Sequence, residues 1–308
     1  MKRRILACLL LAALLLSLCS CSFQNQNSTF RVQFIDVGQG DAALVECDGH
    51  YMLIDGGNKS AGSVVQDVLA HYKIHTLDIL AISHLHEDHF AGLTTALDGI
   101  TRIRLTICNA KKPPKENKTE QSSKNSDRHF AELESQIISK HSKIQVPQKG
   151  KIYNLGSASV EVLDIGNKEE NDSLVLLITY GKTKFLFTGD IEKNMQDEIY
   201  HEYNTPDGFD SFPTHVPLKI NVIKMPHHGS YTDSLEKFLC TFMPEYAVIS
   251  TGNAKMARFE CTISTLEKMK SRSSDEYRMK EYFLTNKQGD IIFESNGKEV
   301  RVIQSQID

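Results

Sequence analysis

Residues 81–92, AISHLHEDHFAG, place three histidines and an aspartate close together directly after an apolar run. Neutral imidazoles and carboxylates are ligands that suit zinc, iron or manganese. If the backbone turns after the apolar run, the side chains of His84 and His86 can converge on one ion. Asp88 and His89 then lie at the start of a following helix and point toward a second position. The spacing therefore predicts two metal ions rather than one.

Two later segments could complete such a centre. Asp190 ends the run KFLFTGD, where the preceding glycine permits a close approach, and its two carboxylate oxygens could bridge two cations. The segment INVIKMPHHGS carries His227 and His228, again just past an apolar run. We expect one member of this pair to be a ligand, with His227 preferred and His228 as the alternative. All of these groups follow predicted strands, where loops form the sites of layered α/β folds.

The elements that must position these residues are predicted from the spacing of apolar side chains. Short aliphatic runs between Gly and Asp turns indicate strands, and longer runs with helical spacing indicate helices. Strands are expected within residues 30–37, 42–47, 51–57, 77–84, 102–108, 157–166, 173–181, 184–190, 220–230, 246–251, 282–286, 290–295 and 299–304. Helices are expected within residues 61–74, 90–100, 128–140, 192–202 and 263–270. This order favours an α/β fold in which two mixed β-sheets pack face to face with helices outside. Residues 111–127, rich in Pro, Lys and Ser, are expected to form a mobile surface loop.

The N-terminal residues 1–21 have a basic start, a short apolar run and small residues at their end, as is typical of a signal peptide. Their last residues, LCSC, resemble the lipobox of bacterial lipoproteins, which implies cleavage before Cys21 and a diacylglycerol on its thiol. An ordinary cleaved signal or an uncleaved anchor is the alternative. Residues 22–29 are predicted to form a polar tether, and residues 30–308 the folded domain. We expect this domain to be held at the cell membrane by its lipid, on the extracellular side.

Composition argues against two features, an overall basic surface and a cysteine zinc site. The 308 residues carry a formal net charge of −4, which provides no overall basic field for long nucleic acid. A small phosphate substrate held by metals would not need such a field. The cysteines outside the signal show no CxxC spacing, which argues against a cysteine zinc site.

The segment SHLHEDHFAG matches the HxHxDH motif of the metallo-β-lactamase fold superfamily, and MLIDGG, FLFTGD and KMPHHGS stand in the superfamily's order around it. Residues 34–46, 171–190 and 223–230 also resemble hallmarks of the C-terminal hydrolase domain of the competence protein ComEC. The resemblance implies a metallo-β-lactamase-type αββα sandwich, a dinuclear metal site and hydrolysis, with a metal-dependent nuclease activity proposed for the ComEC domain. Because a multi-pass channel region is lacking, we expect a stand-alone secreted lipoprotein and not a DNA-uptake channel.

The resemblance also assigns ligands for two divalent ions, zinc or manganese. The first ion would be held by His84 and His86, the second by Asp88, His89 and His227, with Asp190 bridging both. Many members have a further histidine on the first ion, but this chain offers Asn171, Asp172 and Ser173 there, with Asp172 as a candidate substitute. Asp55 resembles an early aspartate that steadies a histidine. The Gly-His-Pro usual after a segment like STGN is absent from residues 252–264.

The expected reaction is hydrolysis of a phosphodiester by a hydroxide that bridges the two ions, with Asp88 and Asp190 as catalytic residues. Lys224 and Ser230 are candidate phosphate contacts. The substrate would be DNA or a cell-wall polymer, and no protein partner is inferred. Two alternatives stay open: a phosphodiesterase resembling the teichoic-acid phosphorylcholine esterases, and a non-catalytic metal-binding surface lipoprotein with a decayed site.

Overall fold

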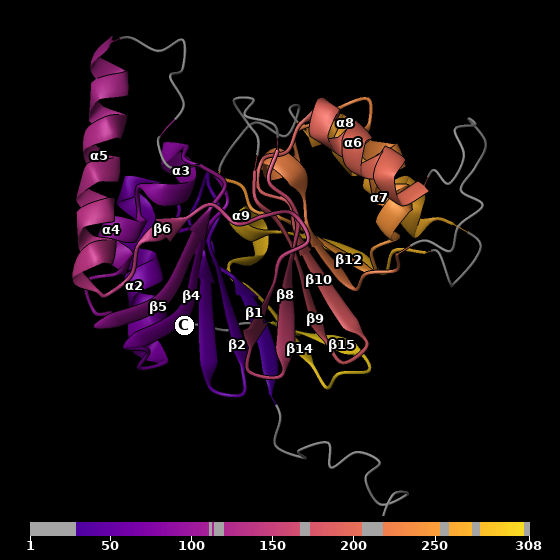
Figure 1. Ribbon diagram of the computed structural model, residues 1–308. Helices are drawn as coiled ribbons and strands as arrows, with labels where there is room; N and C mark the ends of the chain where they lie inside the picture. Colours follow the sequence, from indigo (N-terminus) through magenta and orange to yellow (C-terminus); the bar gives the residue numbers. More distant parts are fainter. Residues whose placement is uncertain are drawn as a thin grey trace, which may run out of the picture.

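The computed structural model shows two β-sheets packed face to face, with helices on both outer sides (Figure 1). This confirms the predicted α/β architecture. The structure describes residues 29–110, 113, 120–166, 173–204, 218–252, 259–272 and 278–304. Cys21, the expected signal peptide and Asp172 lie outside these residues. Within the described ranges, no helix has both the length and the apolar character that crossing a bilayer requires.

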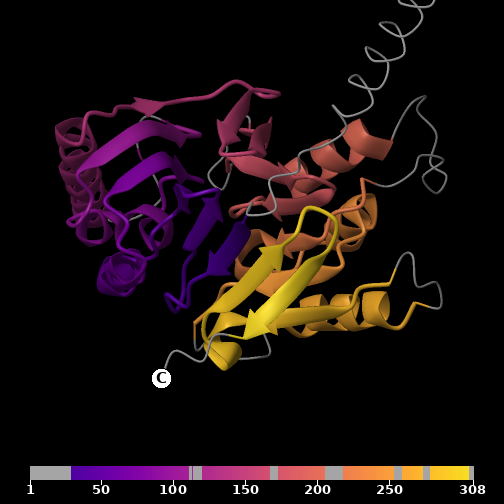
Figure 2. The ribbon, with the colours of Figure 1, turned by 90° about the horizontal axis from the view of Figure 1, so that it is seen from below.

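Both sheets are mixed, as expected. The eight strands of the first sheet are, in spatial order, β15 (Val300–Gln304), β14 (Ile291–Ser295), β1 (Phe30–Phe34), β2 (Ala43–Cys47), β3 (His50–Ile54), β4 (Thr76–Ile82), β5 (Arg102–Cys108) and β6 (Ile144–Gln145). Neighbours are antiparallel from β15 to β3 and parallel from β3 to β6. Figure 2 shows the β14–β15 hairpin, in yellow, beside the indigo strands of the same sheet.

The seven strands of the second sheet are β13 (Glu281–Leu284), β12 (Tyr246–Ile249), β11 (Val222–Lys224), β10 (Thr183–Phe187), β9 (Val175–Tyr180), β8 (Ala158–Asp164) and β7 (Ile152–Leu155). They are parallel from β13 to β10 and antiparallel from β10 to β7. The inner faces of the two sheets share one core of aromatic and aliphatic side chains. Phe30 stacks on Tyr180 and Phe34 on Phe187, with ring centroids 5.0 and 5.5 Å apart, so the two sheets are in direct contact.

Two sets of helices bury the outer faces of the sheets. The first sheet is covered by α2 (Gly62–His71), α4 (Leu93–Ala96) and α5 (Glu120–Ser139), and the second by α6 (Lys193–Asn204), α7 (Leu235–Phe242) and α8 (Glu260–Lys270). Four shorter helices lie in connections: η1 (Lys59–Ala61), α3 (Glu87–Phe90), η2 (Pro226–Gly229) and α9 (Thr285–Gln288).

The prediction of a loop at 111–127 is wrong over its second half, because α5 already begins at Glu120. Phe130, Leu133 and Ile137 bury one side of this helix against the first sheet. The helix continues toward its N-terminus through residues such as Glu120 and Gln121, which have good helix propensity. Residues 111, 112 and 114–119 lie outside the described part of the chain.

The connection that follows the histidine cluster is held by close backbone packing at Gly92. A Cβ atom there would lie 2.1 Å from the carbonyl oxygen of Gly56 and 2.7 Å from that of Asn58. We expect Gly92→Ala to lower the free energy of unfolding by about 3 kcal/mol, because backbone atoms must shift to admit the methyl group. Gly99→Ala, where nothing lies within 4 Å of the added Cβ, is the matched control. Urea unfolding of both variants in chelator checks this, and equal midpoints would contradict the packing described.

Candidate metal centre

Asp190 lies at the centre of the polar cluster. Its Oδ2 atom is 3.2 Å from Nε2 of His89, 3.3 Å from Nε2 of His228, 3.8 Å from Nε2 of His227 and 4.0 Å from Nε2 of His84. The carboxylate is almost fully buried. Burial alone would raise the pKa of Asp190, but the neighbouring imidazoles of His89 and His228 hold it well below the ordinary value. Asp190 is therefore a carboxylate, the form that binds metal.

The turn before Asp190 explains how it reaches this position. Gly189 has a φ of +53°, and a Cβ atom there would lie 2.5 Å from Cβ of Ser173. The Oγ atom of Ser173 accepts a hydrogen bond of 2.9 Å from the backbone N–H of Asp190. The close approach that the sequence predicts for this glycine is thus made against Ser173, just before β9 begins.

His84 and His86 form the first candidate position. They follow β4, and Nε2 of His84 lies 2.9 Å from Nδ1 of His86. Burial and the nearby charge of His89 lower the pKa of His84 well below its ordinary value, so this imidazole is neutral, as a ligand must be. Nδ1 of His84 lies 3.4 Å from the hydroxyl oxygen of Ser173, which comes from the segment where many relatives are expected to carry a further histidine.

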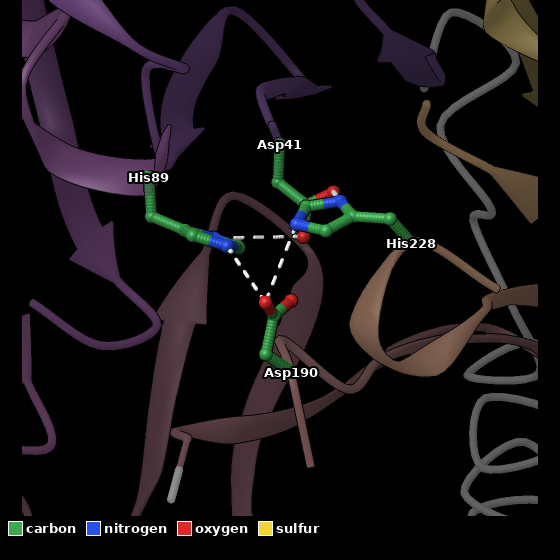
Figure 3. Close-up of side chains that lie close together, drawn as sticks. All are labelled: Asp41, His89, Asp190 and His228. Carbon is green, nitrogen blue, oxygen red and sulfur yellow. Dashed lines mark ion pairs between the residues drawn. The ribbon is translucent and has the colours of Figure 1, made fainter. Parts of the chain in front are cut away.

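Asp88, His89 and His228 form the second candidate position, together with Asp190. Oδ2 of Asp88 lies 3.2 Å from Nε2 of His228, and its Oδ1 lies 3.9 Å from Nε2 of His89. Figure 3 shows His89, His228 and Asp190 pointing toward one another. Side chains from α3, η2 and the end of β10 thus meet at one edge of the two sheets, as predicted for residues that follow strands.

Asp55 contacts the imidazole of His89 on the side away from Asp190. The sequence resemblance predicts a contact of this kind between Asp55 and a histidine. The Oδ2 atom of Asp55 lies 3.0 Å from Nδ1 of His89, so the Nε2 atom of that ring faces Asp190. Ser83 donates to both carboxylate oxygens, from its N–H and from its hydroxyl, each at 2.7 Å. Burial raises the pKa of Asp55. Such hydrogen bonds fix the tautomer and orientation of a ligating imidazole.

The structure brings His228, the alternative, into the cluster and leaves the preferred His227 at its rim. His228 is 3% exposed, and its Nδ1 lies 3.0 Å from the carbonyl oxygen of Ser250, which leaves Nε2 facing Asp190. The side chain of His227 is 26% exposed, and its Nδ1 lies 3.2 Å from Oε1 of Glu192. Both residues adopt left-handed backbone conformations, with φ of 46° and 52°. This double turn decides which imidazole points inward.

Asp41, which the sequence analysis did not select, also lies in the cluster. One ligand atom from each of Asp41, His89, Asp190 and His228 lies within 4.8 Å of the others (Figure 3). Asp41 precedes β2, and its Oδ1 lies 3.3 Å from Nδ1 of His228. The available signal was its place in GQGD, within the segment that resembles a ComEC hallmark, although no metal-ligand spacing surrounds it.

The two candidate phosphate contacts differ in position. Lys224 is buried, and its ammonium group pairs with Asp41 and donates a 2.9 Å hydrogen bond to the carbonyl oxygen of Gly189. This places it beneath the cluster, away from the solvent side where a substrate would arrive. Ser230 is partly exposed and ends η2, where its N–H donates to the carbonyl oxygen of His227 at 2.9 Å.

The donor set fits divalent cations. In the described part of the chain, Nε2 of His89 and of His228, and Oδ1 of Asp41 and of Asp190, are buried without a hydrogen-bond partner. Such groups are rare in folded proteins and need an explanation. Burial would lower the pKa of His89, but Asp190 and Asp55 raise it to about 10. The protonated imidazole thus supplies the positive charge that a bound cation would supply in its place.

Comparisons with known proteins agree with this geometry. A family model described as the Metallo-beta-lactamase superfamily matches residues 35–253. The chain is 28% identical over 233 residues to Recombination protein 2 of Haemophilus influenzae, covering 74% of this chain and 25% of that protein. It is 27% identical over 245 residues to ComE operon protein 3 of Bacillus subtilis, covering 73% and 29%. The chain therefore spans about a quarter of the length of these relatives.

Among solved structures, the metallo-beta-lactamase fold protein YhfI from Bacillus subtilis is similar, with a TM-score of 0.48 and 12% sequence identity. The match covers 82% of this chain and 96% of that chain.

Proposed function

Because the chain belongs to the Metallo-beta-lactamase superfamily, as its motifs predict, we propose that it is a metal-dependent phosphodiesterase that cleaves DNA. The observation that carries the proposal is the convergence of imidazole nitrogens on one buried carboxylate oxygen, Oδ2 of Asp190. The relative named Recombination protein 2 supports nucleic acid as the substrate.

Each residue of the centre has a role that follows from its place. His84 and His86 would hold one divalent ion, zinc or manganese, and Asp88, His89 and His228 would hold the other. Asp190 lies between the two positions and would contact both. Two such ions supply an activated water molecule and positive charge that stabilises the oxygens of a phosphoester.

The solvent side of the centre determines how a substrate can approach. The side chain of Asp88 is 34% exposed, so it can orient a water molecule as well as bind an ion. His227 is exposed at the same rim, with Nε2 3.8 Å from Oδ2 of Asp190, and its ring can donate a hydrogen bond to a phosphate oxygen. Burial of His84, His89 and Asp190 keeps bulk water away from the remainder of the centre.

A substrate panel tests the proposal. The purified protein, loaded with Mn²⁺ or Zn²⁺, is expected to hydrolyse bis-p-nitrophenyl phosphate and single-stranded DNA, and to lose both activities in EDTA. p-Nitrophenylphosphorylcholine is the comparison substrate, because a preference for it would favour a cell-wall phosphodiesterase. Tight metal binding without turnover of any of the three substrates would contradict the proposed enzyme and support a binding protein.

A further inference from the structure

Lys224 is a buried cation next to a candidate metal centre, where a positive charge opposes metal binding. Its side chain is 4% exposed, and its ammonium group lies 3.6 Å from Oδ1 of Asp190 while it pairs with Oδ2 of Asp41. A small pocket of about 10 Å³ borders Asp41, Lys224 and Ser250, with room for one water molecule at most, and both charged side chains are buried. The pair is therefore shielded from solvent.

Asp41 lies close enough to the other candidate ligands to bind the same ion, but its oxygens face Lys224 and the outer side of His228. One of its oxygens lies within 4.8 Å of ligand atoms of His89, Asp190 and His228. Yet Oδ2 is engaged by Lys224, and Oδ1 faces Nδ1 of His228, the nitrogen on the far side of the ring from Asp190. Nδ1 of His228 also lies 3.0 Å from the carbonyl oxygen of Ser250, so Asp41 and Ser250 both face this side of the ring.

We propose that Lys224 holds Asp41 out of the metal coordination sphere, so that Asp41 does not bind the ion itself. Without the ammonium group, a buried carboxylate would lose its partner at a cost of several kcal/mol. A divalent ion in the neighbouring centre would then be its best alternative partner, because hard cations accept further carboxylate oxygens readily. An extra carboxylate would fill a coordination position that water or substrate needs.

The sequence supports such a coupling. Lys224 ends β11, and His228 lies four residues later in η2, so one short segment carries both the ligand and the cation that pairs with Asp41. Lys224 also donates to the carbonyl oxygen of Gly189, the residue before Asp190. Burial would lower the pKa of Lys224, but Asp41 and Asp190 outweigh it and raise the pKa, so the ammonium group stays charged.

The inference rests on the metal-dependent function proposed above, and Co²⁺ provides a probe that does not depend on turnover. We expect Lys224→Met to bind Co²⁺ about tenfold more tightly than the unaltered protein, because the ion loses a nearby cation and gains a ligand. Its visible absorption should weaken, as it does when the coordination number rises. Hydrolysis of bis-p-nitrophenyl phosphate should fall in the same variant.

The double variant Asp41→Asn/Lys224→Met is the matched control, since neither a carboxylate nor an ammonium group is left unpaired. We expect it to keep the Co²⁺ spectrum of the unaltered protein and its affinity within about threefold, even where the single variant does not fold. A double variant with a changed spectrum and weaker binding would show that Asp41 is already a ligand, and would overturn the inference. A folded Lys224→Met with unchanged spectrum and affinity would do the same. Failure of the unaltered protein to bind Co²⁺ would instead reject the proposed function.

Discussion

Asp190→Asn is expected to lose both metal ions and nearly all phosphodiesterase activity. The substitution keeps the size of the side chain and the backbone hydrogen bond to Ser173, but it removes the charge on which His84, His89 and His228 converge. Outer partners of metal ligands typically contribute 10- to 100-fold to activity, so the loss of a shared ligand should exceed about 100-fold in kcat/KM. Elemental analysis after gel filtration should find less than one ion per chain.

Asp67→Asn is the control for this experiment. Asp67 is exposed on α2, and its replacement removes the same charge from the chain without touching the centre. Both variants should unfold cooperatively in EDTA, which separates loss of metal from loss of fold. If Asp190→Asn keeps its full metal content and turnover, Asp190 is not a ligand of the centre.

The second large effect is expected at the histidine pair, where His228→Asn should lose the second metal position and His227→Asn should not. Asparagine is the appropriate replacement because it tolerates the left-handed backbone that both residues adopt. His228 is buried, with Nε2 3.2 Å from Asp88 and 3.3 Å from Asp190, whereas His227 is partly exposed. Metal affinity by competition titration should fall at least about 100-fold in His228→Asn, more than an outer partner would cost.

His227→Asn should keep its metal content and lose activity mainly through KM, because its ring lies on the side where substrate arrives. The opposite pattern, with metal lost from His227→Asn and retained by His228→Asn, would support the preference drawn from the sequence and contradict the geometry described here.

The fold could be predicted from the sequence because its two sheets are made of continuous aliphatic runs. β4, β9 and β10 are apolar over most of their length, since both of their faces are covered. Three short elements were missed. β6 has only two residues and β7 lies at a sheet edge. α7 has a clear apolar face, with Leu235, Phe238, Leu239 and Phe242 buried, but it is only eight residues long. The early start of α5 was missed because its first residues, EQSSKNSD, carry no apolar period.

The candidate site was predictable where its residues share a spacing. His84, His86, Asp88 and His89 lie within one short segment, and their chemistry is visible without a structure. The choice between His227 and His228 was not predictable, because two successive left-handed residues in η2 determine which ring points inward. The roles of Asp41 and Lys224 depend on an ion pair between residues far apart in the chain.

The most direct test of the central claim is a crystal structure of the Mn²⁺-loaded protein with anomalous scattering data. The account predicts two anomalous peaks within bonding distance of Asp190, one beside His84 and His86 and the other beside Asp88, His89 and His228. A protein crystallised in excess Mn²⁺ with no peak at these side chains, or with peaks only elsewhere, would contradict a metal centre at this edge of the sheets.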